Sequence, residues 1–191
     1  MQKSLIILGS GGHASVLLEI IRECQFPIKG YVDFNENPLM KEYYLGADSF
    51  LERASFQDEV LLVNGLGSIH KPYKRKEIFE KYKNLGYQFQ TLVHPKAILS
   101  QEKKLGEGVQ IMAGVVLQTG CVIGENSIIN TGAHIDHHST IGQHTHIAPS
   151  VTLCGNVTVG HVTHIGPNST LIQGVVVGDE KFIPAASLIK E

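Results

Sequence analysis

An apolar residue recurs at every sixth position throughout the C-terminal half of the chain, and this repeat restricts the possible folds more than any other feature. The series runs without an insertion through Leu99, Leu105, Ile111, Leu117, Ile123, Ile129, Ile135, Ile141, Ile147, Leu153, Val159, Ile165, Leu171, Val177, Ile183 and Ile189. A period of six places no continuous apolar stripe on a helix of 3.6 residues per turn, which excludes a helical interpretation. The repeat therefore predicts a left-handed parallel β-helix in which each hexapeptide forms one side of a coil.

A second period, of eighteen residues, is superimposed on the first. It consists of glycines that directly follow an apolar position: Gly106, Gly124, Gly142, Gly160 and Gly178. Six-residue sides and eighteen-residue coils predict a triangular prism whose coils stack about 4.8 Å apart, with these glycines at one corner. Residues eighteen apart should then lie directly above one another. The flat sides of such a prism can pack together, so we expect a homotrimer.

The N-terminal part of the chain has a different rhythm, in which short apolar runs alternate with helical patterns. We expect strands at residues 5–8, 28–32, 60–63 and 87–93, a helix after the first strand, and a second helix over residues 70–84 that stops at Gly86. This alternation predicts a small α/β, Rossmann-like subdomain with a parallel sheet. We place it at residues 1–92 and the β-helix at residues 93–191.

From the composition we expect a soluble, cytoplasmic enzyme. The chain is 42% hydrophobic and 18% charged, with a net charge of −2, so it has no basic excess that would indicate nucleic-acid binding. No stretch reaches the roughly 18 apolar residues that span a bilayer, and the N-terminal apolar run is too short for a signal peptide. The three cysteines have neither metal-binding nor disulfide spacing, which suits a reducing compartment.

A glycine-rich turn follows the first predicted strand. Gly9, Gly11 and Ala14 are spaced as in a dinucleotide-binding fingerprint, and Asp33 follows about 20 residues later, where a ribose ligand would stand. Backbone N–H groups at the start of the following helix could bind a pyrophosphate. Only half of a dinucleotide-binding domain precedes the prism, which excludes NAD and suffices for one nucleotide. A tight turn without a ligand is the alternative.

Seven of the ten histidines lie between residues 134 and 164. They could be surface residues of a polar prism, ligands of a metal, or a general base with ligand-binding neighbours. A zinc site of the carbonic anhydrase type needs two histidines five residues apart on one strand. No pair in this stretch has that spacing, which argues against such an enzyme.

Several of these segments together resemble one family, the bacterial sugar acyltransferases that include sialic acid O-acetyltransferases and nucleotide-sugar N-acetyltransferases. The similar segments are Asn130-Thr-Gly, His137 preceded by Asp136, His146-Ile-Ala-Pro, Gly155-Asn156, Gly9–His13, Val63–Ser68 and Thr91–Pro95. They cover nearly the whole chain. The family has an acidic residue directly after its catalytic histidine, where this chain has His138. Its C-terminal segment over coenzyme A also differs from residues 187–191.

The resemblance implies an acetyltransferase that uses acetyl-CoA and a nucleotide-sugar. His137 would be the general base, with Asp136 or His138 orienting its ring. The Gly155 N–H, one coil above His137, would stabilise the developing oxyanion. Asn130, His146 and Pro167 would contact acetyl-CoA.

For the N-terminal part, the resemblance implies a nucleotide-sugar site lined by Gly11, Gly12, His13, Asp33 and Gly67. We expect N-acetylation of a nucleotide-linked amino sugar for surface glycan synthesis. O-acetylation of a sialic-acid-like sugar is the first alternative, since one histidine base serves either nucleophile. A zinc enzyme and a non-enzymatic structural repeat are the remaining ones.

Overall fold

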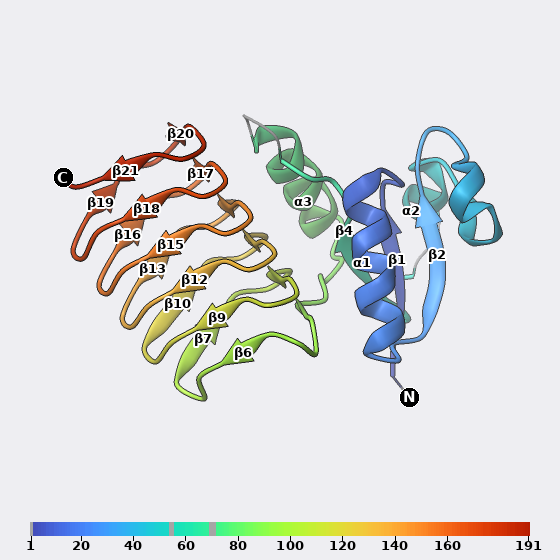
Figure 1. Cartoon of the computed structure of the whole chain (residues 1–191). Coiled ribbons are helices and arrows are strands. Elements are labelled where there is room, and N and C mark those ends of the chain that lie inside the picture. Colours follow the sequence, from blue (N-terminus) through green and yellow to red (C-terminus); the bar gives the residue numbers. More distant parts are fainter. Residues whose placement is uncertain (1, 54–55, 69–71) are drawn as a thin grey trace. The chain divides into compact units, whose positions relative to one another are not determined.

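The computed structural model describes residues 2–53, 56–68 and 72–191. The chain forms two compact units, one comprising the residues up to Gly67 together with Glu77–Gln90, the other Ser68–Lys76 together with Thr91–Glu191. Figure 1 shows the order of the elements along the chain. Within the described part of the chain, no helix is both long and apolar enough to cross a membrane.

The first unit is built on a four-stranded parallel sheet in the order β3-β2-β1-β4. Its elements are β1 (Ser4–Leu8), α1 (Gly12–Glu23), β2 (Ile28–Val32), the 3₁₀ segment η1 (Pro38–Tyr43), β3 (Tyr44–Gly46), α2 (Ser49–Arg53) and β4 (Val60–Asn64). The predicted α/β subdomain and three of its strands are confirmed. Helix α1 buries Leu17, Ile20 and Ile21 and leaves Val16 exposed. The short elements η1, β3 and α2 were not predicted, because their sequences have no periodic pattern.

The strand predicted over residues 87–93 is wrong as a single element. Phe89 pairs with Leu62 of β4 in the first unit, whereas β5 (Leu92–Val93) belongs to the second. The division falls where the six-residue rhythm begins, and an apolar run cannot reveal which sheet each half joins. The helix predicted over 70–84 is observed as α3 (Tyr73–Asn84), followed by Gly86 with φ +85°. The predicted start at residue 70 lies outside the described residues.

The second unit contains the predicted prism, which is drawn as a stack of coils in Figure 1. After β5 its strands are β6 (Ile98–Leu99), β7 (Lys103–Leu105), β8 (Gln110–Ile111), β9 (Val116–Leu117), β10 (Cys121–Ile123), β11 (Ile128–Ile129), β12 (His134–Ile135), β13 (Thr140–Ile141), β14 (His146–Ile147), β15 (Thr152–Leu153), β16 (Thr158–Val159), β17 (His164–Ile165), β18 (Thr170–Leu171), β19 (Val176–Val177), β20 (Phe182–Ile183) and β21 (Leu188–Ile189). They form three parallel sheets, which run from β7 to β19, from β5 to β20 and from β6 to β21. In each sheet a strand pairs with the strands three before and three after it in chain order. The register is eighteen residues, as in the pairing of Ile129 with Ile147.

The apolar series fills the interior of the prism as predicted. Its central members, such as Ile129, Ile147 and Ile165, are fully buried in one core, and those of the end coils are partly buried. Every sixth residue from Gly108 to Ala186 has a positive φ and turns the chain at a corner. The glycines spaced by eighteen are not among them.

Four of those glycines, Gly106, Gly124, Gly142 and Gly160, are explained by the close approach of neighbouring coils, whereas a Cβ at Gly178 would meet only the Lys181 side chain. A Cβ at Gly142 would lie 2.6 Å from the carbonyl carbon of Gly160 and 2.6 Å from the nitrogen of His161. Such distances to backbone atoms leave no room for any side chain. These four positions are therefore glycine because the coils pack closely there, and not because the corner requires a positive φ.

Residues 72–76 lie against one corner of the prism. The Arg75 Nε donates to the Asn126 carbonyl (3.0 Å), and the Asn126 amide donates to the Arg75 carbonyl (3.3 Å) and to His144 Nδ1 (2.9 Å). Burial lowers the pKa of Arg75 to about 9. Burial, and then the charges of Lys76 and Arg75, lower the pKa of His144 to about 4, so this imidazole is neutral near pH 7.

Candidate active site

His137 and His138 lie in the turn between β12 and β13, at one corner of the prism. His138 holds the left-handed conformation of that corner, with φ +59°. The Asp136 Oδ1 accepts a hydrogen bond from the His137 N–H (2.8 Å), which fixes the first residues of the turn. Ser139 is buried behind it, and its hydroxyl donates to the Cys154 carbonyl (3.2 Å). The turn thus presents two exposed imidazoles on a fixed backbone.

The structure places the His137 ring over Gly155, one coil further along the chain. The Asn156 N–H donates to the His137 carbonyl (2.8 Å), and a Cβ at Gly155 would lie 2.5 Å from both Nε2 and Cε1 of the imidazole. This is the stacking predicted from the eighteen-residue register. Among the described residues, no acceptor is hydrogen bonded to the Gly155 N–H. A ring nitrogen and a backbone donor are therefore neighbours at this corner.

The ring of His137 is held by His138. Their Nδ1 atoms are 3.1 Å apart, and the rings meet edge to face with centroids 5.3 Å apart. A hydrogen bond between two neutral imidazoles requires one Nδ1 to carry a proton and the other to accept it. If His137 donates, its Nε2 keeps a lone pair beside Gly155. Asp136 contacts the backbone of His137, so of the two candidate orienting residues His138 is the one that contacts the ring.

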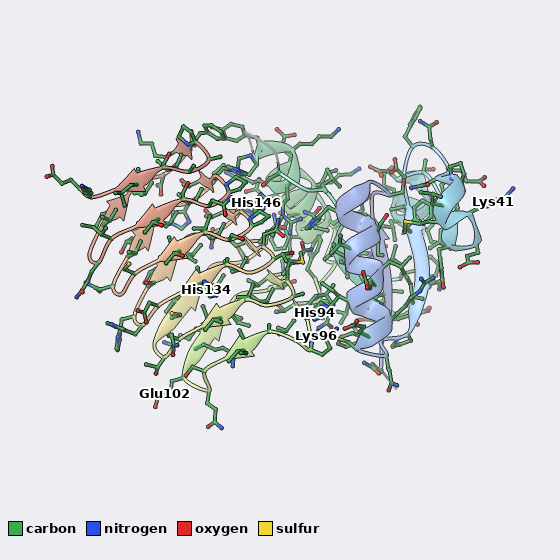
Figure 2. All side chains as sticks on the ribbon, viewed as in Figure 1. Lys41, His94, Lys96, Glu102, His134 and His146 are labelled. Atoms are coloured by element: carbon green, nitrogen blue, oxygen red, sulfur yellow. The ribbon has the colours of Figure 1, made fainter. Side chains whose placement is uncertain are left out.

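Asn130 and His146 form a second group, on the sheet that contains β11 and β14. The His146 Nδ1 is 2.8 Å from both the carbonyl and the hydroxyl of Ser68, and its Nε2 is 3.0 Å from the Asn130 amide nitrogen. Because a carbonyl only accepts, Nδ1 carries the proton, and Nε2 accepts from the Asn130 amide. His146 is buried, whereas His134 at the start of β12 is exposed on the next side of the prism (Figure 2). Ser68 was not predicted as part of this group.

Pro167 lies one corner away from His137. It is in the turn between β17 and β18, at the corner to which Asn130 also belongs, two coils below. Within one chain, the structure therefore brings His137, His138, Asp136 and Gly155 together. It does not bring Asn130, His146 or Pro167 to them. In the part of the chain that the structure describes, no three His, Cys, Asp or Glu side chains are grouped as a metal ion would require.

The predicted nucleotide-sugar residues of the first unit meet at the carboxyl ends of its strands. Gly11 precedes α1 in an extended conformation, and a Cβ at Gly11 or Gly12 would meet no atom within 4 Å. Gly67 lies beside His13, since a Cβ there would be 3.4 Å from the His13 Cβ. The closely packed glycine is Gly65, where a Cβ would be 2.6 Å from the Leu8 carbonyl oxygen. There is therefore open space beside the backbone of Gly11 and Gly12, whereas the backbone at Gly65 is closely packed.

Asp33 fastens this turn. Its Oδ2 accepts from the Ser10 N–H (2.8 Å) and hydroxyl (2.7 Å), and its Oδ1 accepts from the Phe34 N–H (2.6 Å). The Asn37 amide donates to the Ser10 carbonyl (2.6 Å). Ser10 and Asn37 were not predicted, although a serine enclosed by glycines in such a turn is a signal that could have indicated the first. With these three bonds, both oxygens of the Asp33 carboxylate already accept hydrogen bonds from within the chain.

Both halves of the chain match known sequence families. Residues 4–82 match the PglD N-terminal domain, and residues 102–137 and 120–155 match the bacterial transferase hexapeptide (six repeats). A UDP-N-acetylbacillosamine N-acetyltransferase from Bacillus subtilis (strain 168) is 32% identical over 115 residues, 58% of this chain. The match spans about half of that relative, 52% of its length.

Solved structures match over the whole chain. A variant of the GDP-perosamine N-acetyltransferase from Caulobacter crescentus, in complex with CoA and GDP-perosamine, is 30% identical with a TM-score of 0.91, covering 100% of this chain and 90% of that one. The acetyltransferase domain of PglB from Neisseria gonorrhoeae FA1090, in complex with acetyl coenzyme A, is 25% identical with a TM-score of 0.80, covering 98% and 96%. These matches confirm the left-handed β-helix with its α/β N-terminal domain. The chain belongs to the hexapeptide-repeat family of sugar acetyltransferases.

Proposed function

We propose that this protein transfers the acetyl group of acetyl-CoA to the amino group of a nucleotide-linked sugar used in surface glycan synthesis. The observation that carries the proposal is the position of the His137 imidazole over Gly155, with a ring nitrogen beside a backbone N–H that has no protein acceptor among the described residues. The relatives whose names specify N-acetylation of a nucleotide-sugar support the choice of acceptor.

His137 acts as the general base in this proposal. Its Nε2 takes a proton from the sugar amine while the amine nitrogen bonds to the thioester carbonyl carbon, and a neutral imidazole suits that step near pH 7. The Gly155 N–H donates to the carbonyl oxygen as that oxygen becomes negative. The carbon–sulfur bond then breaks, and the sulfur receives the proton that the amine has lost, from His137 Nε2. Asp136 keeps the turn in shape through the backbone of His137.

Acetyl-CoA is the proposed co-substrate of the prism, with Asn130, His146 and Pro167 as its further contacts beside Gly155. Both ring nitrogens of His146 are engaged within the chain, so we assign it to holding the Asn130 side chain rather than to a direct polar contact. Because Asn130 and His137 occupy different corners, a site that uses both at the thioester is completed by a second copy. This supports the homotrimer, and the three free cysteines suit a cytoplasmic location.

The nucleotide-sugar is proposed to bind the N-terminal domain, residues 1–92, while residues 93–191 carry the chemistry. The open backbone at Gly11 and Gly12 would receive the pyrophosphate at the start of α1. His13 and Gly67 would line the same site. Asp33 would act mainly by holding the turn through Ser10.

The proposal is tested by incubating the protein with acetyl-CoA and a panel of UDP-, GDP- and CMP-linked sugars while following thiol release. We expect turnover with at least one nucleotide-linked amino sugar. Mass spectrometry of the product should show one added acetyl group on nitrogen. Turnover with a sialic acid alone would replace this proposal with the O-acetyltransferase alternative.

A further inference from the structure

The two imidazoles of the His137–His138 pair lean in opposite directions along the prism. His137 lies over Gly155 on the coil that follows, and His138 lies over Gly120 on the coil that precedes. Between them, the two Nδ1 atoms are 3.1 Å apart. The pair therefore forms a line of four ring nitrogens, from His137 Nε2 at one end to His138 Nε2 at the other.

We propose that this line is a proton relay, with His138 carrying away the proton that His137 takes from the substrate. His137 accepts a proton at Nε2 and passes its Nδ1 proton to His138 Nδ1. His138 then releases its own Nε2 proton to water, which its exposed side chain can reach. Each imidazole gains one proton and loses one, and a swap of the ring tautomers resets the pair.

Glycines on both neighbouring coils make room for the pair. A Cβ at Gly120 would lie 2.7 Å from His138 Cδ2 and 3.1 Å from its Nε2, and one at Gly155 would lie 2.5 Å from His137 Nε2. Gly155 has no positive φ that would by itself require glycine. Its small size is thus explained by the imidazole above it. Both rings need a glycine next to them to hold these positions.

The proposal rests on the proposed function, because the amine acceptor supplies the proton that the relay carries away. An amino sugar that arrives as an ammonium ion must lose two protons to become an amide. One of them ends on the sulfur of coenzyme A, and the other has to leave the site. A single neutral imidazole can accept only one further proton, whereas the pair gives the other proton an exit. An acidic residue after the base, as the family has, could accept a hydrogen bond there in place of His138.

The test compares two substitutions at His138, both suited to its left-handed backbone. Asn156 and Gly174 occupy the equivalent corner on later coils, with φ +58° and +79°. His138→Asn keeps an acceptor near the Nδ1 position and cannot relay a proton, and His138→Gly removes the ring. We expect kcat to fall by roughly 10²-fold in both, and free imidazole to restore His138→Gly in a saturable way.

A fast His138→Asn variant beside a slow His138→Gly variant would mean that His138 only positions the base, and the relay is then wrong. It is equally wrong if both variants are fast, or if imidazole restores nothing. His161→Asn is the matched control, since His161 lies in another turn and its Nδ1 accepts from the Gln143 N–H, which an asparagine oxygen can replace.

A measurement without substrate separates this proposal from the proposed function. In protein labelled with ¹⁵N-histidine, a scalar coupling between the two Nδ1 nuclei reports their shared hydrogen bond. We expect the coupling in the wild type and its loss in His138→Gly. Its absence in the wild type would overturn the relay whatever the acetylation assay shows. Wild-type protein that has the coupling but releases no thiol with any amino sugar would overturn the proposed function instead.

Discussion

Gly155 lies directly against the imidazole of His137, so that a methyl group on its α-carbon would be 2.5 Å from Nε2. We predict that Gly155→Ala lowers acetyl transfer by roughly 10²-fold. The added methyl group would push the ring away from the reacting atoms, while the backbone at this position accommodates alanine. Thiol-release kinetics and thermal unfolding measured together check this. Gly178→Ala is the control, since its Cβ would meet only the end of Lys181, at 3.8 Å.

His137→Asn tests the base directly. An asparagine can reproduce a hydrogen bond near Nδ1 but has no basic nitrogen, so we expect kcat to fall by about 10²–10⁴-fold. The melting temperature should stay close to that of the wild type, because the side chain is exposed at a corner. Near-normal turnover would place the base elsewhere in the chain.

Gly142→Ala tests how closely the coils approach one another. Its Cβ would lie 2.6 Å from backbone atoms of Gly160 and His161, which cannot move without displacing a coil. We expect a loss of at least about 2 kcal/mol in the free energy of unfolding, as for other overpacked interiors. Chemical denaturation measures it. Gly178→Ala, in the same column but with only the Lys181 side chain near its Cβ, should be neutral. Equal effects at the two glycines would contradict the packing argument.

Acidification should destabilise the protein through His144. Burial lowers its pKa from 6.5 to about 4 in the folded state, so the unfolded chain binds the proton first as the pH falls. The contribution of His144 is therefore complete above pH 6.5 and is lost progressively between pH 6.5 and 4. One pKa unit corresponds to about 1.4 kcal/mol, which predicts a loss of roughly 1–3 kcal/mol.

Denaturation curves from pH 7 to 4 measure that loss, and His144→Asn provides the comparison. Asparagine suits the left-handed backbone at this corner, where φ is +57°. The variant should show a shallower decline with pH than the wild type. Parallel curves for the two proteins would assign the acid sensitivity to other groups.

Ser10→Ala examines the role of Asp33. If Asp33 acts by fastening the turn, removing the Ser10 hydroxyl should raise the KM for the nucleotide-sugar severalfold, and Asp33→Asn should raise it further. The KM for acetyl-CoA should not change in either variant. A strong effect of Asp33→Asn with none of Ser10→Ala would instead indicate direct contact between the carboxylate and the ligand.

The repeat predicted the prism well because each period is visible as one kind of residue, an apolar residue at every sixth position and a glycine at every eighteenth. Ile129 and Ile147 had to pair once the coil length was eighteen, and Gly155 had to stack on His137 for the same reason. The boundary near Leu92 could not be predicted, since an apolar run looks the same whichever sheet it joins. The elements between Asp33 and Val60 were missed because short segments carry no periodicity.

At the candidate site, the register predicted which residues share a column, but not which atoms meet. That His138 contacts the ring of His137 while Asp136 contacts its backbone depends on side-chain torsions within one turn. The partnership of His146 with Ser68 joins residues 78 positions apart, for which no pattern in the sequence gives a signal. The assigned roles of these residues remain predictions for the experiments above.

The eighteen-residue register also determines how such a chain can change in length. Inserting eighteen residues adds a whole coil and returns every later side chain to its former edge of the prism. Inserting six residues moves all later residues to the next edge, and an insertion of six between His137 and Gly155 would take Gly155 out of the column that the two residues share. Functional relatives should therefore differ in length by multiples of eighteen residues within the repeat. Other insertions should occur as loops that extend outward from a turn and leave the register of the coils unchanged.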